Sequence, residues 1–188
     1  MLQQGVLKAV VEALERVGMN YMLTGSVVSS LQGEPRATHD IDVVVAVRTD
    51  DLDQLLSSFP SESFYFDKEA AREAVTRKSV FGLIDLVGGA KVDFWPLTDD
   101  AFDQCRFSRR QRQNLLGVEA FVSSPEDTIL MKLRWAVVSC SSRRQLTDAT
   151  RVYEVQRERL DLQYLEEWVE RIGVRDLWER IRREADSE

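Results

Sequence analysis

The chain has 188 residues, of which 44% are apolar and 30% charged, and its formal net charge is −7. This composition is ordinary for a globular protein with a buried core, and the length predicts one domain or two small ones. The acidic balance argues against a sequence-independent nucleic-acid binder, because such a protein needs a basic face.

Membrane insertion and secretion are not expected. No apolar run approaches the roughly 18 residues that a transmembrane helix needs, and residues 1–19 are typical of an amphipathic helix, not of a signal peptide. Cys105 and Cys140 show no disulfide framework. We therefore expect a cytoplasmic protein. With one histidine and two distant cysteines, a structural zinc site is not expected.

The first part of the chain mixes helical and strand patterns. Apolar residues at helical spacing predict a helix over residues 2–17, and a short strand follows at Tyr21–Thr24. Gly25-Ser26 breaks this strand, one or two helical turns come next, and residues 33–35 form a loop. The valine-rich run Ile41–Val47 predicts a buried strand.

The mixture continues to about residue 123. Two helices are expected, over residues 51–58 and 69–77. The runs 79–87 and 90–95 are typical of strands, and the Gly88-Gly89 pair between them is a strong hairpin signal. A second pair of short strands is expected within residues 105–122.

From Ser124 onward every pattern is helical. Ser124-Pro125-Glu126-Asp127 provides a cap, a proline in the first turn and acids that favour a helix N-terminus. Helices are expected over residues 125–140, 144–158, 161–172 and 174–185. We therefore predict an α/β (α+β) domain over residues 1–123, with a mixed β-sheet flanked by helices, and a C-terminal helical bundle over residues 124–188.

Two aspartates stand at the start of the buried strand. Side chains alternate faces along a strand, so Asp40 and Asp42 point the same way. Two unit charges about 4 Å apart repel by roughly 4 kcal/mol at an effective dielectric near 20. A divalent cation removes this repulsion, and carboxylate oxygens suit Mg²⁺ or Mn²⁺.

A third carboxylate and a glycine-serine turn extend this pattern. Asp93 lies in an apolar strand, and if that strand neighbours Ile41–Val47 it completes the triad that two-metal phosphoryl transfer requires. Asp85, on the other arm of the hairpin, is the rival candidate, although the strand around Asp93 is more apolar. Gly25 at a strand-to-helix break lets backbone N–H groups face a phosphate, and the Ser26 hydroxyl can join them.

Together these residues resemble the nucleotidyltransferase superfamily of the DNA polymerase β type. The matching segments are Leu23-Thr24-Gly25-Ser26, Asp40-Ile41-Asp42 and Asp93. The stretch PRATHDIDVVV is similar to bacterial minimal nucleotidyltransferases and to AbiEii-type toxins of toxin–antitoxin systems. The resemblance covers about residues 5–150 and implies a nucleotidyltransferase-type sheet.

The resemblance also implies an activity. It is the metal-dependent transfer of a nucleoside monophosphate from an NTP, such as ATP, to a hydroxyl acceptor, with release of pyrophosphate. Asp40, Asp42 and Asp93 would bind Mg²⁺ or Mn²⁺, Asp93 would help to deprotonate the acceptor, and Gly25 and Ser26 would hold the triphosphate. The acceptor (RNA, protein or small molecule) and the base stay open. The alternative is an inactive member that acts as a binding partner in a toxin–antitoxin pair, although the intact triad argues against it.

Several residues around this core have two interpretations. Lys132 either reaches the triphosphate or lies on a solvated helix face. Arg36 either contacts the nucleotide or is solvated in its loop. His39 adjoins Asp40 and is expected to pack or to support it by a hydrogen bond. Arg144 and Asp148 lie one helical turn apart, so an intrahelical ion pair is favoured.

Two further groups are assigned by their surroundings. Four arginines either receive a phosphate-bearing acceptor such as RNA or belong to a solvated hairpin, and the second interpretation is favoured; they are Arg106, Arg109, Arg110 and Arg112. Three tryptophans on helical apolar faces are expected in the core, not as base-stacking platforms; they are Trp135, Trp168 and Trp178.

Overall fold

The computed structural model of the chain describes residues 2–36, 38, 40–138 and 142–186. Its strands are β1 (Tyr21–Thr24), β2 (Asp40–Val45), β3 (Phe64–Tyr65), β4 (Phe81–Asp85), β5 (Lys91–Pro96), β6 (Gln111–Leu115) and β7 (Val118–Val122). Within the described residues they form one sheet in the order β3-β4-β5-β2-β1-β7-β6. The sheet is mixed, because β2 runs parallel to β5 and antiparallel to β1.

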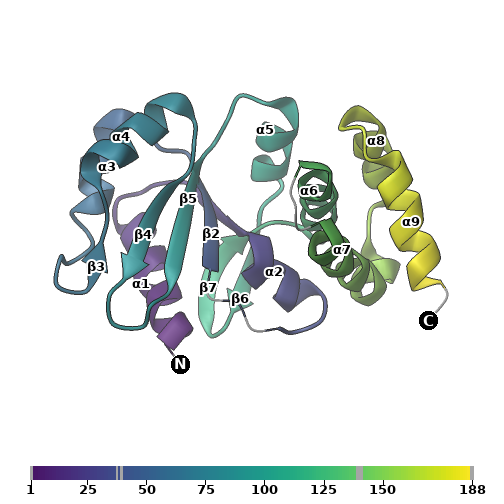
Figure 1. Cartoon of the computed structure of the whole chain (residues 1–188), viewed down its shortest axis with the longest axis horizontal. Coiled ribbons are helices and arrows are strands. Elements are labelled where there is room, and N and C mark those ends of the chain that lie inside the picture. The colour runs from purple at the N-terminus through teal and green to yellow at the C-terminus, as the bar shows by residue number, and fades with distance from the viewer. Residues whose placement is uncertain (1, 37, 39, 139–141, 187–188) are drawn as a thin grey trace.

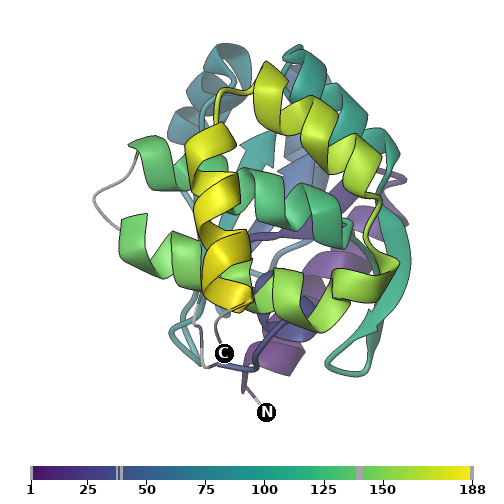
Figure 2. The same cartoon turned by 90° about the vertical axis from the view of Figure 1, so that its right-hand side faces the viewer.

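The helices are α1 (Leu2–Arg16), α2 (Gly25–Gln32), α3 (Thr49–Leu56), α4 (Lys68–Arg77), α5 (Ala101–Ser108), α6 (Pro125–Val138), α7 (Ser142–Gln156), α8 (Leu162–Arg171) and α9 (Arg175–Ala185). The sheet occupies one half of the molecule and α6–α9 the other (Figure 1). In the view from the helical side, these helices stand in front of the sheet (Figure 2). The predicted mixed sheet, flanked by helices and followed by a helical bundle, is confirmed.

The two faces of the sheet differ because strand side chains alternate. On one face, residues such as Leu23, Val43 and Phe94 are buried in a core shared with α1, α3 and α4. On the other face, Met22 and Val44 pack against Phe107 of α5. This second face also carries Asp42, so the polar site lies on the side of the sheet that faces the helical half.

The second pair of short strands expected within residues 105–122 is confirmed as β6 and β7. The sequence prediction missed α5, which begins at Ala101 and ends at Ser108. The Asp100 side chain caps this helix by accepting hydrogen bonds from the backbone N–H groups of Phe102 and Asp103. Phe102 is buried in the same apolar cluster as α6–α9. A division of the chain near residue 123 stays a prediction, and α5 packs across it.

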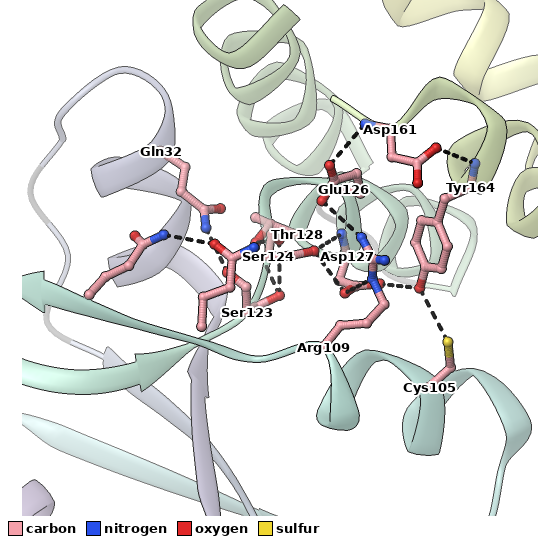
Figure 3. Close-up of polar contacts among 12 residues, drawn as sticks. Gln32, Cys105, Arg109, Ser123, Ser124, Glu126, Asp127, Thr128, Asp161 and Tyr164 are labelled. Atoms are coloured by element: carbon pink, nitrogen blue, oxygen red, sulfur yellow. Dashed lines mark hydrogen bonds and ion pairs between the residues drawn. The ribbon is translucent and has the colours of Figure 1, made fainter. Parts of the chain in front are cut away.

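A buried polar network fixes the start of α6 (Figure 3). Asp127 accepts hydrogen bonds from Ser124 Oγ at 2.8 Å, from the Tyr164 hydroxyl at 2.6 Å and from Arg109 Nε at 3.3 Å. Arg109 stacks on the Tyr164 ring, 3.7 Å from its centroid, and pairs with Glu126. The predicted Ser124 cap is confirmed. Because α5, α6 and α8 meet in this network, the face that α6 turns toward the sheet is fixed.

None of the helices in the described part of the chain combines the length and the apolar character needed to cross a lipid bilayer.

Candidate active site

The turn from β1 into α2 brings backbone donors to the polar face of the sheet. Gly25 has a φ of +72°, and a Cβ there would lie 2.7 Å from Asp42 Cγ. Only glycine meets both conditions without strain. The Thr24 side chain does not cap α2, so the first backbone N–H groups of this helix are suited to an anion.

The Gly25→Ala variant is expected to lose about 1–3 kcal/mol of folding free energy, because its Cβ would force the half-buried Asp42 side chain to move. Urea unfolding of the variant and of the parent protein measures this loss. Gly5→Ala is the matched control, since a Cβ at Gly5 meets no atom within 4 Å. Equal stability of the two variants would contradict the close contact between Gly25 and Asp42.

Two of the three predicted aspartates lie directly opposite each other. In the parallel pair β2–β5, Asp42 is the register partner of Asp93, and Asp40 is the partner of Lys91. Trp95 Nε1 donates a hydrogen bond of 3.1 Å to Asp42 Oδ1. Lys91 Nζ lies 2.9 Å from Asp93 Oδ1. The predicted adjacency of the two strands is therefore confirmed, and a lysine already neutralises part of the negative charge.

Electrostatic interactions link these groups. Burial raises the pKa of Asp42, and the charges of Asp93 and Asp40 add to this increase, while the Trp95 hydrogen bond and Lys132 oppose it. The hydrogen bond to Asp93 raises the pKa of Lys91, with smaller contributions from Asp40 and Asp42. The carboxylates thus form a cluster of negative potential that attracts a cation.

The carboxylates do not enclose a metal-binding site in this structure. Across the described residues, no set of three or more carboxylate, histidine or cysteine side chains is gathered closely enough to hold a metal ion. The carboxylate donors nevertheless suit a hard metal cation. The half-exposed Lys91 ammonium pairs with Asp93, as a bound metal ion would. Metal binding by Asp40, Asp42 and Asp93 therefore remains a prediction that this chemistry fits.

A second network joins the loop before β2 to the helical half. Arg36 donates to Ser26 Oγ at 2.7 Å and pairs with both oxygens of Asp148, at 3.0 and 2.9 Å. Lys132 Nζ lies 2.6 Å from Asp148 Oδ2. The solvated alternative for Lys132 is wrong, because only 5% of this residue is exposed. Two cations share one carboxylate here, so positive charge remains beside the Ser26 turn.

Burial and ion pairing compete within this network. Burial would raise the pKa of Asp148, but Arg36 and Lys132 hold that pKa below its usual range. Burial lowers the pKa of Lys132, although Asp148 opposes the decrease. The expected pairing of Asp148 with Arg144 is wrong, because the Asp148 side chain turns inward to Arg36 and Lys132 instead. Sequence spacing gave no signal for this long-range pair.

A cavity of about 490 Å³ opens between the polar face of the sheet and α6. Its lining includes the Gly25-Ser26 turn, Asp42 and Lys132, and it continues to α5. Trp135 also lines it and is 38% exposed, so its predicted place in the core is wrong. Its ring meets the ring of Trp95, with centroids 5.7 Å apart. Trp168 and Trp178 are buried as predicted.

Asp85, the rival candidate to Asp93, lies at the turn of the hairpin. Asp85 is buried and caps the hairpin turn, where it accepts hydrogen bonds from the backbone N–H groups of Val87 and Gly88. It therefore does not replace Asp93 at the site. His39 lies outside the described residues.

The four arginines do not form one basic surface. Arg106 is buried on α5, and Arg109 pairs with Glu126 and Asp127. Arg110 and Arg112 both lie over the Phe121 ring of β7, and Arg112 is exposed on β6, 3.7 Å from Glu15. The hairpin interpretation fits these two arginines, whereas Arg106 and Arg109 are engaged in contacts on or beside α5.

No protein-family model and no curated protein matches the chain. Several solved structures are similar. The antigenic nucleotidyltransferase-like protein from Paracoccidioides brasiliensis has a TM-score of 0.54 and 20% identity, with 96% of this chain and 92% of that chain covered.

Two further similar structures are of proteins with bound small molecules. ANT(2″)-Ia in complex with adenylyl-2″-tobramycin has a TM-score of 0.59 and 12% identity, with 93% of this chain and 99% of that chain covered. The lincosamide antibiotic adenylyltransferase LnuA, bound to lincomycin, has a TM-score of 0.53 and 14% identity, with 81% and 97% covered. Identities this low establish the fold alone: the chain has the nucleotidyltransferase fold.

Proposed function

We propose that the protein is a divalent-metal-dependent nucleotidyltransferase, which transfers a nucleoside monophosphate from an NTP to a hydroxyl acceptor and releases pyrophosphate. The observation that carries this proposal is the contact between Gly25 and Asp42, with Asp93 opposite Asp42 on the next strand. This contact supports the proposal because the Gly25 turn, whose backbone N–H groups suit a phosphate, lies against paired carboxylates, on a fold shared with nucleotidyltransferases.

The positive groups would hold the triphosphate. The first N–H groups of α2 and the Ser26 hydroxyl can donate hydrogen bonds to phosphate oxygens. Arg36 already donates to Ser26 Oγ, and Lys132 lines the same cavity. Before a triphosphate binds, Asp148 holds Arg36 and Lys132 in place. Once it is bound, both cations would pair with the triphosphate as well as with Asp148.

The carboxylates would hold the metal ions and the proton. Asp40, Asp42 and Asp93 would bind Mg²⁺ or Mn²⁺, which requires the Lys91 ammonium to leave Asp93. Bound ions would offset charge on the triphosphate and make the acceptor hydroxyl easier to ionise. Asp93, at the edge of this group, would accept the proton of that hydroxyl.

The acceptor is best explained as a small molecule. The chain carries a net charge of −7, and two of the four arginines that suggested RNA binding, Arg106 and Arg109, pair with acidic residues of the protein itself. Two proteins of the same fold are in complex with adenylyl-2″-tobramycin and with lincomycin. A toxin–antitoxin context, with a cognate toxin or antitoxin as partner in the cytoplasm, rests on the sequence resemblance of PRATHDIDVVV alone.

Labelled nucleotides test this proposal. The purified protein is incubated with each α-labelled NTP, with Mg²⁺ or Mn²⁺, and with separated RNA, protein and small-molecule fractions of a lysate. We expect label in one fraction and release of pyrophosphate. Asp93→Asn should reduce both by about 100-fold or more, whereas Asp50→Asn, an exposed acid at the start of α3, should not.

Two results would contradict the proposal in different ways. Unchanged transfer by Asp93→Asn would mean that the assignment of the site is wrong. Absence of pyrophosphate release with every NTP and every fraction, together with tight binding of a co-encoded protein, would favour the inactive binding partner.

A further inference from the structure

The cavity beside Ser26 has both apolar and charged lining. Val44, Trp95 and Trp135 line it, and so do Asp103 and Arg106 of α5. Its volume of about 490 Å³ lies in the range of small-molecule sites. A ligand that fills it would therefore meet both aromatic rings and a guanidinium.

Arg106 has more hydrogen-bond donors than the protein satisfies. Its side chain is only 6% exposed, and its Nε donates to Asp103 Oδ1 at 2.8 Å. The Thr98 hydroxyl donates to the other oxygen of Asp103. Nη1 of Arg106 is buried and has no hydrogen-bond partner among the described residues. Because an unsatisfied buried donor is costly, a ligand acceptor atom that pairs with Nη1 would stabilise the side chain of Arg106.

The lining residues indicate which part of the substrates enters the cavity. Gly25, Ser26 and Lys132, the proposed triphosphate-binding groups, are among them. Asp40 and Asp93, beside which the acceptor hydroxyl would react, are not among the described residues that line it. A nucleotide with its triphosphate at Ser26 would thus extend its base into the cavity, and the acceptor would approach from the opposite side.

Resting on the function proposed above, we propose that this cavity is the nucleobase subsite and that Arg106 selects a keto base, guanine first. A guanidinium has only donors, and guanine offers it two adjacent acceptors, O6 and N7. Adenine places an amino donor where guanine has O6, so two donors would face each other. The rings of Trp95 and Trp135 provide apolar surface against which a base can pack.

Nucleotide binding by the parent protein is the first test. Titration calorimetry with GTP, ATP, UTP and CTP, each with Mg²⁺ and without acceptor, gives four dissociation constants. We expect GTP to bind at least tenfold more tightly than ATP, and UTP more tightly than CTP. Equal or tighter binding of ATP would overturn the keto-base assignment and leave the proposed function intact. Failure of all four to bind would overturn both.

Variants of Arg106 are the second test. Arg106→Lys keeps a cation beside Asp103 but loses the second nitrogen of the fork, so it should remain folded, as circular dichroism would verify. We expect it to weaken GTP binding at least tenfold and to leave ATP binding within twofold. Arg112→Gln, an exposed arginine on β6, is the matched control. A merely structural role of Arg106 predicts equal weakening of both nucleotides, and that result would overturn the proposal.

Discussion

The Asp42→Asn variant is expected to lose nucleotidyl transfer and, at the same time, to gain thermal stability. Asp42 is held against Gly25 and opposite Asp93, where burial and the neighbouring carboxylates disfavour its charge. Asparagine keeps an oxygen for the Trp95 indole and nearly the same volume. The exchange thus removes a charge that the proposed function needs but that lowers the stability of the folded protein.

The gain should depend on pH with a definite sign. The pKa of Asp42 is raised in the folded protein, so its ionisation destabilises the fold at pH values above that raised pKa. We expect Asp42→Asn to melt roughly 2–4 °C higher than the parent at pH 7.5. The difference should shrink toward zero below about pH 4, where the aspartate is protonated in both folded and unfolded chains.

Magnesium separates this explanation from a general packing effect. Mg²⁺ should raise the melting temperature of the parent protein, since a ligand of the folded state stabilises it, and should have little effect on Asp42→Asn. Asp50→Asn is the control and should behave as the parent in both measurements. A lower melting temperature for Asp42→Asn at pH 7.5 would contradict the electrostatic origin of its raised pKa.

Local sequence patterns were enough to predict the arrangement of the carboxylates, but not the contacts of the residues that surround them. The alternation of side chains along β2 predicted that Asp40 and Asp42 share a face. The apolar pattern around Asp93 predicted a strand that could lie beside β2. The break at Gly25-Ser26 predicted the start of α2. Each of these signals lies within a few residues of sequence, where period and turn chemistry apply.

Contacts between distant segments followed no such signal. Arg36 and Asp148 are 112 positions apart, so helical spacing suggested Arg144 as the nearer partner. Trp135 has the periodicity of a core residue, but its side of α6 faces the cavity. The helix α5 was missed although Asp100 offers a local capping signal. Tertiary packing decided the first two cases, and a single sequence does not encode it locally.

The Asp148→Asn variant is expected to be strongly destabilised at neutral pH. Asp148 and Lys132 are 8% and 5% exposed, and the carboxylate also holds Arg36 by two hydrogen bonds. Removing the carboxylate leaves a buried ammonium and a partly buried guanidinium without compensation, which costs about 3–5 kcal/mol. Thermal melts at pH 7 should show a fall of roughly 10 °C. Because the pKa of Asp148 is lowered in the fold, its contribution is complete above about pH 4 and is lost as the pH falls through that lowered pKa, below which the variant and the parent should converge.

Asp53→Asn is the matched control, because Asp53 pairs with Arg72 at 2.8 Å on the exposed surface. An exposed pair contributes about 1 kcal/mol or less, so equal destabilisation of the two variants would contradict the buried network. Tripolyphosphate extends the test to function. If Arg36 and Lys132 face the triphosphate, their uncompensated charges in Asp148→Asn should make tripolyphosphate restore more stability to the variant than it adds to the parent. Equal shifts in both proteins would mean that the two cations serve only to join α6, α7 and the loop before β2.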